Sequence, residues 1–188
     1  MTRMVRLILA SASPRRHALL DQIGLDHRQI PSGLSEDVDI KDPKDQVVSL
    51  ALAKAKDIAR HYPDDCILGA DTVVVFENEI MGKPKNDDEA QIMLATLSGK
   101  THRVLTGIAL VKDGGRSVLT ACEETRVTFR SLDEKEIADY IASGEAWDKA
   151  GAYGIQGRAA VFVERIEGCY FNVVGLPLSR LIMLMKQW

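Results

Sequence analysis

The apolar run from Cys66 to Phe76 constrains the fold more than any other stretch, because it is the most continuous apolar run in the chain. Such a run is typical of a central strand that is buried on both faces. Only Asp71 and Thr72 interrupt it. A carboxylate inside a buried strand is costly unless it binds a metal, accepts several hydrogen bonds or lines an active site. Asp71 is therefore the leading candidate for a functional residue.

A second segment, residues 5–16, predicts a strand, a tight turn and a helix. Ser13 is the expected N-cap, and a proline follows it at the first helical position. Arg15 and Arg16 then place two cations in the first turn, where the helix dipole favours negative charge. Together with the hydroxyls of Ser11 and Ser13 and the backbone N–H groups, the two guanidinium groups suit a phosphate. An ordinary capped helix with two solvated arginines remains the alternative.

Signals for helices and strands alternate along the rest of the chain. Helices are expected at residues 43 to about 61, 86–97, 131–144 and 178–186, and strands at 66–76, 101–112, 116–130, 160–166 and 169–174. Residues 33–39 are expected to form a loop, and no strand is expected between the first two helices. Because hairpins and helical crossovers both occur, this order predicts a single α/β domain, residues 1–188, with a mixed sheet.

Lys54 lies on the apolar stripe of the helix expected to begin at residue 43. A solvated lysine is not expected on such a stripe. Its side chain either extends outward along its apolar stem or points into a cleft that holds negative charge. The sequence alone leaves both interpretations open.

Charge and cysteine usage limit the classes of partner. A net charge of −3 gives no general attraction to nucleic acid or to an anionic membrane, so a phosphate site has to be a local cluster for a small ligand. No stretch approaches the length that spans a bilayer. Cys66, Cys122 and Cys169 show neither a disulfide framework nor zinc-site spacing, which favours a reducing cytoplasm. The four histidines do not cluster in the sequence and are interpreted as surface or supporting residues.

The separate features point to one chemistry. Arg15 and Arg16 at a helix start, Asp71 in a central strand, and lysines at 54 and 83 together combine phosphate-binding cations with an acidic group. A carboxylate beside a phosphate site usually implies a divalent cation, because it would otherwise repel the substrate. The reaction that this set favours is hydrolysis of a phosphoanhydride.

Several motifs also occur in a fixed order along the chain. They are Ser11-x-Ser13-Pro14-Arg15-Arg16, Gly69-Ala70-Asp71-Thr72, Lys83-Pro84, Leu97-Ser98-Gly99-x-Thr101-His102, and the segment from Ser143 to Gly157 that contains Tyr153-Gly154-Ile155-Gln156-Gly157. The sequence resembles the Maf proteins, nucleoside triphosphate pyrophosphatases that are also called septum formation inhibitors. The last motif is similar to the branch of the family that prefers dTTP and UTP. The resemblance runs nearly end to end.

The resemblance implies an inosine-triphosphatase-like (Maf/Ham-type) fold, with a long mixed sheet flanked by helices and a cleft between two lobes. It implies a cytoplasmic enzyme, often a homodimer, that splits a nucleoside triphosphate between the α- and β-phosphates with Mg²⁺ or Mn²⁺. The products would be the nucleoside monophosphate and pyrophosphate.

The resemblance also assigns expected roles to residues of this sequence. Asp71 matches the proposed proton acceptor, although it could instead hold the metal ion together with Glu36. Residues linked to substrate choice are Arg15, Thr72 and Gln156, and the expected phosphate-binding residues are Ser11, Ser13, Arg16, Lys54 and Lys83. The amide of Gln156 carries a donor and an acceptor that can pair with O4 and N3–H of uracil or thymine. Tyr153 either stacks on the base or packs within its loop.

Two alternatives to this function remain. The chain could bind a triphosphate as a regulator of cell division without significant turnover. It could also hydrolyse modified or other non-standard nucleotides by the same reaction.

Overall fold

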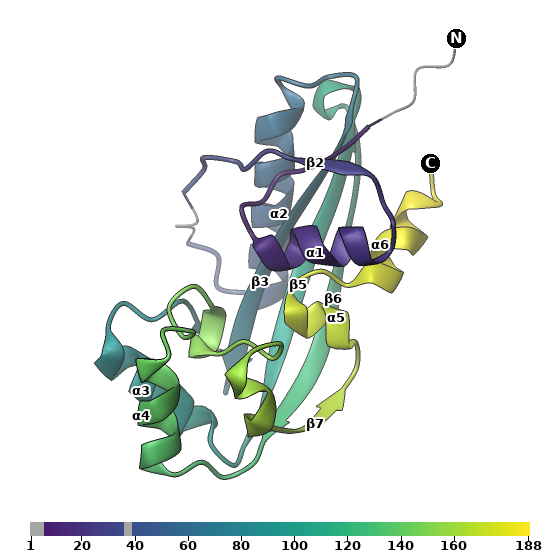
Figure 1. The fold of residues 1–188 in the computed structure, drawn as a ribbon. Coiled ribbons are helices and arrows are strands. Elements are labelled where there is room, and N and C mark those ends of the chain that lie inside the picture. Colours follow the sequence, from purple (N-terminus) through teal and green to yellow (C-terminus); the bar gives the residue numbers. More distant parts are fainter. Residues whose placement is uncertain (1–5, 36–38) are drawn as a thin grey trace. The chain divides into compact units, whose positions relative to one another are not determined.

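The computed structural model describes residues 6–35 and 39–188, and Figure 1 shows its helices and strands. The strands are β1 (Leu7–Leu9), β2 (His27–Gln29), β3 (Cys66–Phe76), β4 (Glu79–Met81), β5 (Thr101–Lys112), β6 (Ser117–Phe129) and β7 (Val163–Glu167). The α-helices are α1 (Pro14–Gln22), α2 (Pro43–Ala59), α3 (Asp87–Leu97), α4 (Glu134–Ala142), α5 (Tyr170–Val174) and α6 (Leu178–Met185). Short 3₁₀ segments lie at Asp113–Gly115, Ala150–Ala152 and Arg158–Phe162.

The strands form one mixed sheet in the order β2-β1-β3-β5-β6-β7, and β4 pairs with β3 outside this path. β1 runs parallel to β2 and to β3, whereas β3 with β4 and β6 with β7 are antiparallel pairs. The mixed α/β sheet expected from the sequence is thus confirmed. β3 is buried along almost its whole length, as its apolar composition predicted.

Contacts along the chain divide it into two compact units. The first comprises the described residues up to Asp71 together with Thr106–Glu123 and Gly175–Trp188, and the second comprises Thr72–Leu105 and Glu124–Val174. The long strands β3, β5 and β6 each contribute residues to both units.

The core of the first unit lies where α2 packs on β1, β3 and β5. Two strand glycines allow this contact, because an added Cβ at Gly69 would overlap the Ala51 carbonyl oxygen and one at Gly107 would overlap that of Val47. Glycine inside a strand commonly marks such a close approach of two backbones. Around it lies a cluster of small and branched apolar side chains, which includes Ile8, Ala10, Ala51, Ala55, Ile58, Ala59, Ile67, Ala109 and Val111.

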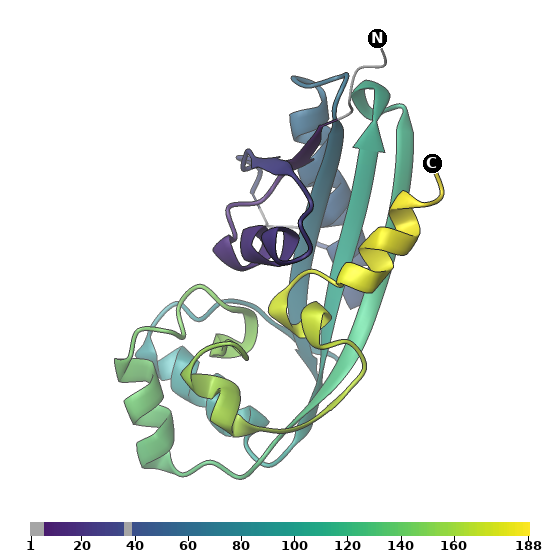
Figure 2. The same cartoon turned by 45° about the vertical axis from the view of Figure 1, so that its right-hand side comes forward.

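The start of α1 and the end of the chain complete the first unit. Ser13 is the N-cap of α1, where its hydroxyl accepts a hydrogen bond from the backbone N–H of Arg16, and a proline begins the helix as predicted. α6 runs alongside β6 (Figure 2), and the Arg180 guanidinium donates to the Glu123 carboxylate at 2.9 Å. β2 was not predicted. It is a short, polar strand at the edge of the sheet, so it carries no apolar pattern.

The second unit differs from the expected elements in several places. The strand expected at residues 160–166 begins only at Val163, after the 3₁₀ segment Arg158–Phe162. The helix expected at residues 131–144 has its N-cap at Asp133, with Glu136 completing a capping box. Ser131 with Glu134 fits the same four-residue pattern, so the sequence alone allows either start. Residues 169–174 were expected to be a strand, but they contain the short helix α5. Asn172 is buried there and donates to the Val104 carbonyl oxygen, a contact that local sequence does not reveal.

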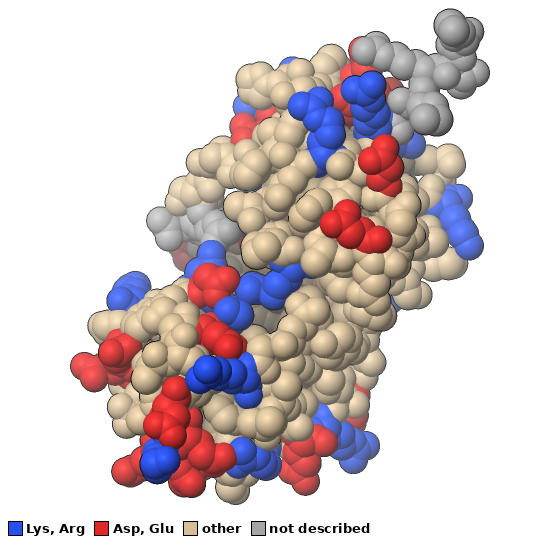
Figure 3. Space-filling model, viewed as in Figure 1, with Lys and Arg blue, Asp and Glu red and all other residues tan. Residues whose placement is uncertain are grey.

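Charged side chains of both signs are interspersed on the face seen in Figure 3, notably around α3 and α4. Ion pairs such as Lys135 with Asp139 and Arg130 with Glu136 contribute to this pattern. Among the described residues, none of the helices is long and apolar enough to cross a membrane.

Candidate active site

A buried ion pair joins α2 to β3 in the first unit. Lys54 Nζ lies 2.7 Å from Asp71 Oδ1, and each side chain is 10% exposed. The lysine therefore does not extend outward to solvent. Of the two interpretations left open by the sequence, the structure supports the one in which Lys54 faces a negative charge.

The packing of α2 on β3 explains why this pair forms. Gly69 lets α2 approach the strand at Ala51. Asp71 lies two residues beyond Gly69, which places it on the same face of β3, and Lys54 lies about one helical turn beyond Ala51. The two side chains therefore meet between α2 and β3, next to the contact of Ala51 with Gly69. Isolated burial of either charge would be costly, so each stabilises the other.

The turn before α1 is held by a network around Ser11. Its hydroxyl oxygen accepts hydrogen bonds from the backbone N–H of Ser13 at 3.2 Å and from Arg16 Nη1 at 3.0 Å. Arg16 Nε donates to the Gly175 carbonyl oxygen at 2.8 Å, and Gln29 Nε2 donates to the Ser11 carbonyl oxygen at 2.8 Å. Arg16 thus braces the turn against the segment that leads into α6. Arg15, the adjacent arginine, is half-buried.

Strand pairing relates this turn to the ion pair. β1 and β3 are parallel neighbours with Leu9 opposite Leu68, and the Ala10 N–H donates to the Leu68 carbonyl oxygen at 2.8 Å. Ser11 and Asp71 each follow these paired positions by a few residues, so both lie beyond the same end of the paired segment. The turn at Ser11 and the buried carboxylate of Asp71 therefore both lie beyond the same end of the β1–β3 pairing.

The second unit carries Thr72, Lys83 and Gln156. Thr72 is half-buried and directly follows Asp71 on β3, whereas Lys83 and Gln156 are exposed. Within this unit the Gly151 N–H donates to the Gly82 carbonyl oxygen at 3.0 Å, which joins the start of the loop that carries Gln156 to the residue before Lys83. Glu36, an expected metal ligand, lies outside the described residues.

The loop around Gln156 is anchored on both sides. The Gly154 N–H donates to the Tyr140 hydroxyl at 3.2 Å, and the Arg158 N–H donates to Glu145 Oε2 at 2.9 Å. A Cβ added at Gly157 would overlap that same Glu145 oxygen. These contacts fix the backbone on either side of Gln156 and leave its amide at the surface.

Tyr153 packs within the second unit. It is 5% exposed, and its ring contacts those of His102 and Phe129 edge to face. Its hydroxyl lies 2.7 Å from His102 Nε2, and burial raises the pKa of the phenol. The interpretation of Tyr153 as a packed loop residue is therefore the one that the structure supports.

His102 is a buried neutral imidazole. Within the described residues its Nδ1 has no hydrogen-bond partner. Burial lowers the pKa of His102 from 6.5 to about 4, because the charged form loses its hydration.

This burial predicts a loss of stability in acid. Below pH 6.5 the unfolded chain takes up a proton at His102 more readily than the folded protein does, so stability falls between pH 6.5 and about 4 and is fully retained above that range. The loss from this group is up to about 3 kcal/mol. Urea unfolding of the parent and of His102→Gln across this range measures it. Between pH 6.5 and about 4 the free energy of unfolding should fall less in the variant than in the parent. An equal fall in both proteins would contradict the prediction.

Two of the histidines lie together, which corrects the expectation that they do not cluster. His17 Nδ1 and His27 Nε2 are 2.7 Å apart. This contact could not be predicted from the sequence, because it depends on β2. The chain reverses after α1, and β2 then returns beside that helix.

Comparisons with known proteins agree with the motifs. The family model described as "Maf-like protein" matches residues 6–188. A Geobacillus sp. (strain WCH70) protein named dTTP/UTP pyrophosphatase is 54% identical over 185 residues, covering 98% of both chains. A Bacillus cereus protein of the same name is 50% identical over 187 residues, which is 98% of this chain and 96% of that protein.

A solved structure of the Staphylococcus aureus Ham1 protein aligns with 66% of this chain and 71% of its own, at a TM-score of 0.46 and 15% identity. The match to the family model covers nearly the whole sequence, and the relatives are about half identical to it from end to end. The chain belongs to the Maf family.

Proposed function

We propose that this protein is a nucleoside triphosphate pyrophosphatase that hydrolyses dTTP and UTP to the monophosphate and pyrophosphate. The observation that carries the proposal is the buried Lys54–Asp71 pair, which lies beyond the same end of the β1–β3 pairing as the arginine-bearing turn before α1. Relatives that are 54% and 50% identical are named dTTP/UTP pyrophosphatase, which supports this substrate choice.

In this proposal Asp71 assists the attack of water on the triphosphate. Its carboxylate either accepts a proton from the water or helps to orient it. The hydrogen bond from Lys54 fixes one carboxylate oxygen, so the position of the group is set before substrate binds. A preorganised group does not have to reorient during the reaction.

The cationic side chains bind and neutralise the phosphates. Arg15 and Arg16, with the hydroxyls of Ser11 and Ser13, stand at the start of α1, where the helix dipole also favours an anion. Arg16 is already braced by Ser11 and Gly175, so its guanidinium is held in a fixed orientation. Lys83 is a further proposed phosphate-binding residue.

Asp71 is the proposed protein ligand of a divalent cation. Mg²⁺ is usually held by one or two carboxylates together with phosphate oxygens of the substrate. Asp71 supplies one such carboxylate, and Glu36 remains the proposed second ligand. When bound there, Mg²⁺ or Mn²⁺ would polarise the phosphoanhydride and offset the negative charge that develops on the leaving group.

We propose that the Gln156 side chain recognises the base. Its exposed amide can donate to O4 and accept from N3–H of uracil or thymine. The anchored backbone on either side fixes the position of the Gln156 main chain, which limits the entropy lost by the loop when a base binds. Thr72 and Arg15 are the further proposed determinants of substrate choice.

Replacing Gln156 with leucine tests that role. We expect kcat/KM for dTTP and UTP to fall by about 10- to 100-fold, because two hydrogen bonds to the base are lost. Rates with other nucleoside triphosphates should change much less. Steady-state kinetics give kcat/KM for each nucleoside triphosphate in the parent and in the variant. An equal loss of kcat/KM for every base would show that Gln156 does not recognise the base.

A panel of triphosphates at equal concentration tests the function as a whole. Pyrophosphate and orthophosphate are measured separately, with Mg²⁺ and with Mn²⁺. We expect pyrophosphate from dTTP and UTP ahead of the other canonical nucleotides. Saturable UTP binding without release of pyrophosphate would favour the alternative of a regulator of cell division. Faster release of pyrophosphate from modified nucleotides would favour the alternative of an enzyme for non-standard nucleotides.

The proposed place of action is the cytoplasm. The three cysteines are free, and burial raises the pKa of the Cys66 thiol to about 11, which keeps it protonated and unreactive. Free thiols are typical of proteins in a reducing compartment. A homodimer, which the family resemblance implies, stays a prediction.

A further inference from the structure

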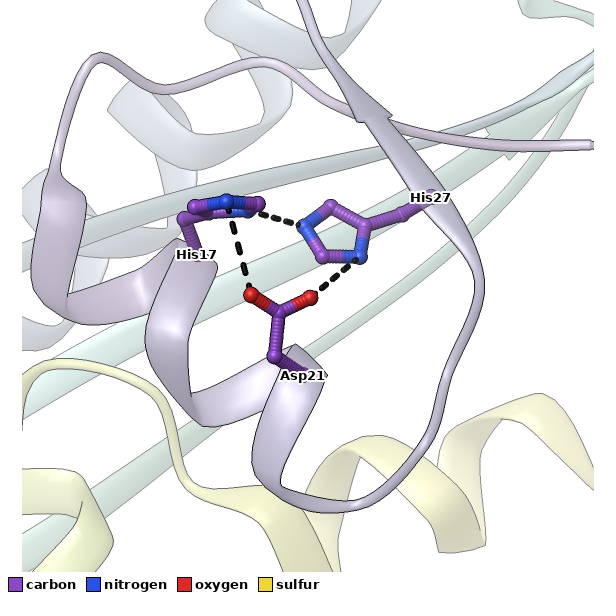
Figure 4. Close-up of side chains that lie close together, drawn as sticks. All are labelled: His17, Asp21 and His27. Carbon is purple, nitrogen blue, oxygen red and sulfur yellow. Dashed lines mark hydrogen bonds and ion pairs between the residues drawn. The ribbon is translucent and has the colours of Figure 1, made fainter.

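Three potential metal ligands lie together on the first unit, away from the Lys54–Asp71 pair in sequence. They are His17 and Asp21 of α1 and His27 of β2 (Figure 4). One ligand atom from each residue lies within 4.8 Å of the others. His17 Nε2 is 3.4 Å from Asp21 Oδ2, and His17 Nδ1 is 2.7 Å from His27 Nε2.

The local fold brings these side chains to one place. His17 and Asp21 are four residues apart on α1, so they lie on the same face of the helix. The chain then reverses through Gly24, whose φ of 65° suits glycine, and continues into β2. His27, the first residue of β2, faces the pair on α1 (Figure 4).

The hydrogen bonds of His27 prepare it as a ligand. Its Nδ1 lies 2.8 Å from the Leu25 carbonyl oxygen, which can only accept, so Nδ1 carries the hydrogen. In the neutral imidazole the lone pair is then on Nε2, where it accepts a hydrogen bond from His17 Nδ1 (Figure 4). An ion takes this lone pair only when the half-exposed His17 ring turns and gives up the hydrogen bond. A backbone carbonyl that fixes the tautomer in this way is the usual partner of a metal-binding histidine.

Burial distinguishes the three ligands. The His27 side chain is 1% exposed, whereas those of His17 and Asp21 are 46% and 58% exposed. One ligand is thus rigidly held inside the fold, and the other two lie at the surface, where an ion can enter and water can complete its coordination.

We propose that His17, Asp21 and His27 form a binding site for a divalent transition-metal ion. Two imidazoles and one carboxylate suit Zn²⁺ and similar ions, whereas Mg²⁺ prefers oxygen ligands alone. The site is therefore chemically different from the one proposed at Asp71. An ion bound here links α1 to β2 and so stabilises the helix whose first turn carries Arg15 and Arg16.

A calorimetric titration of the full chain with Zn²⁺, without nucleotide, tests the site. We expect one Zn²⁺ per chain in the wild type and at least about tenfold weaker binding in His17→Gln, because even indirect partners of a ligand are worth 10- to 100-fold in affinity. His61→Gln is the matched control, since His61 is exposed on another segment, and it should bind as the wild type does. Equal affinity in the wild type and His17→Gln would overturn the proposal.

Thermal unfolding with and without Zn²⁺ gives a second readout that does not depend on activity. Zn²⁺ should raise the Tm of the wild type, and this shift should be lost in His17→Gln and Asp21→Asn, both of which change exposed side chains. Asp71→Asn should keep both the Zn²⁺ binding and the shift. Loss of Zn²⁺ binding in Asp71→Asn would place the ion at the proposed catalytic residue and overturn the proposal, while leaving the proposed function untouched.

Discussion

Replacing Asp71 with asparagine is expected to lower the turnover of dTTP at least about 100-fold, the range for a lost acid–base or metal-orienting group. Asparagine has nearly the same shape and still offers an oxygen to Lys54, but it neither accepts a proton from water nor carries charge. Pyrophosphate release under saturating dTTP measures the change. Equilibrium binding of dTTP should be retained.

A matched control separates this effect from a general one. Asp57, on α2 of the same unit, accepts a hydrogen bond from the Ser32 hydroxyl at 2.9 Å and has no role in the proposed site. Asp57→Asn should therefore keep the parental turnover. If Asp71→Asn hydrolyses dTTP at the parental rate, the assignment of Asp71 is wrong.

Replacing Lys54 with methionine should produce the largest loss of stability among these variants. The Asp71 carboxylate would stay buried without its lysine, and breaking a buried pair in this way typically costs about 3–5 kcal/mol. Methionine keeps much of the length and the apolar stem of lysine, so lost packing contributes little. Urea unfolding at pH 7 measures the free energy of unfolding.

The double variant Lys54→Met with Asp71→Asn should recover much of that stability. Removing both charges avoids the burial of an unpaired one, and such exchanges are often nearly neutral. An additive loss in the double variant would show that the two side chains do not depend on each other.

The elements that local sequence specifies well were predicted correctly. Ser13 precedes a proline and is the N-cap of α1, and the helix expected to begin at residue 43 does begin there. The apolar composition of β3 likewise predicted its burial. These signals act within a few residues, so they are readable without the rest of the fold.

The elements that failed depend on contacts between distant residues. β2 is polar and is a strand only because β1 offers it an edge. The residues of α5 contain an apolar run that suits a strand or a helix equally, and in the structure the buried Asn172 of this helix donates to the distant Val104 carbonyl oxygen and Thr125 hydroxyl. Two overlapping capping patterns at the start of α4 left the choice between Ser131 and Asp133 to tertiary structure.

The candidate site shows the same division. Asp71 stood out because a carboxylate is rare in a buried strand, but its partner could not be inferred, since Lys54 reaches it only through the contact at Gly69. A glycine within an apolar strand was a usable signal of that contact. The pairing of His17 with His27 had no such signal, because the strand that carries His27 was not recognised.

The most direct test of the proposed reaction centre is pyrophosphate release from dTTP by the double variant Lys54→Met with Asp71→Asn. We expect a folded protein whose turnover stays at least about 100-fold below that of the wild type, because the reaction centre is lost although the fold is not. A folded double variant that releases pyrophosphate at the wild-type rate would contradict the claim that the buried pair is the reaction centre.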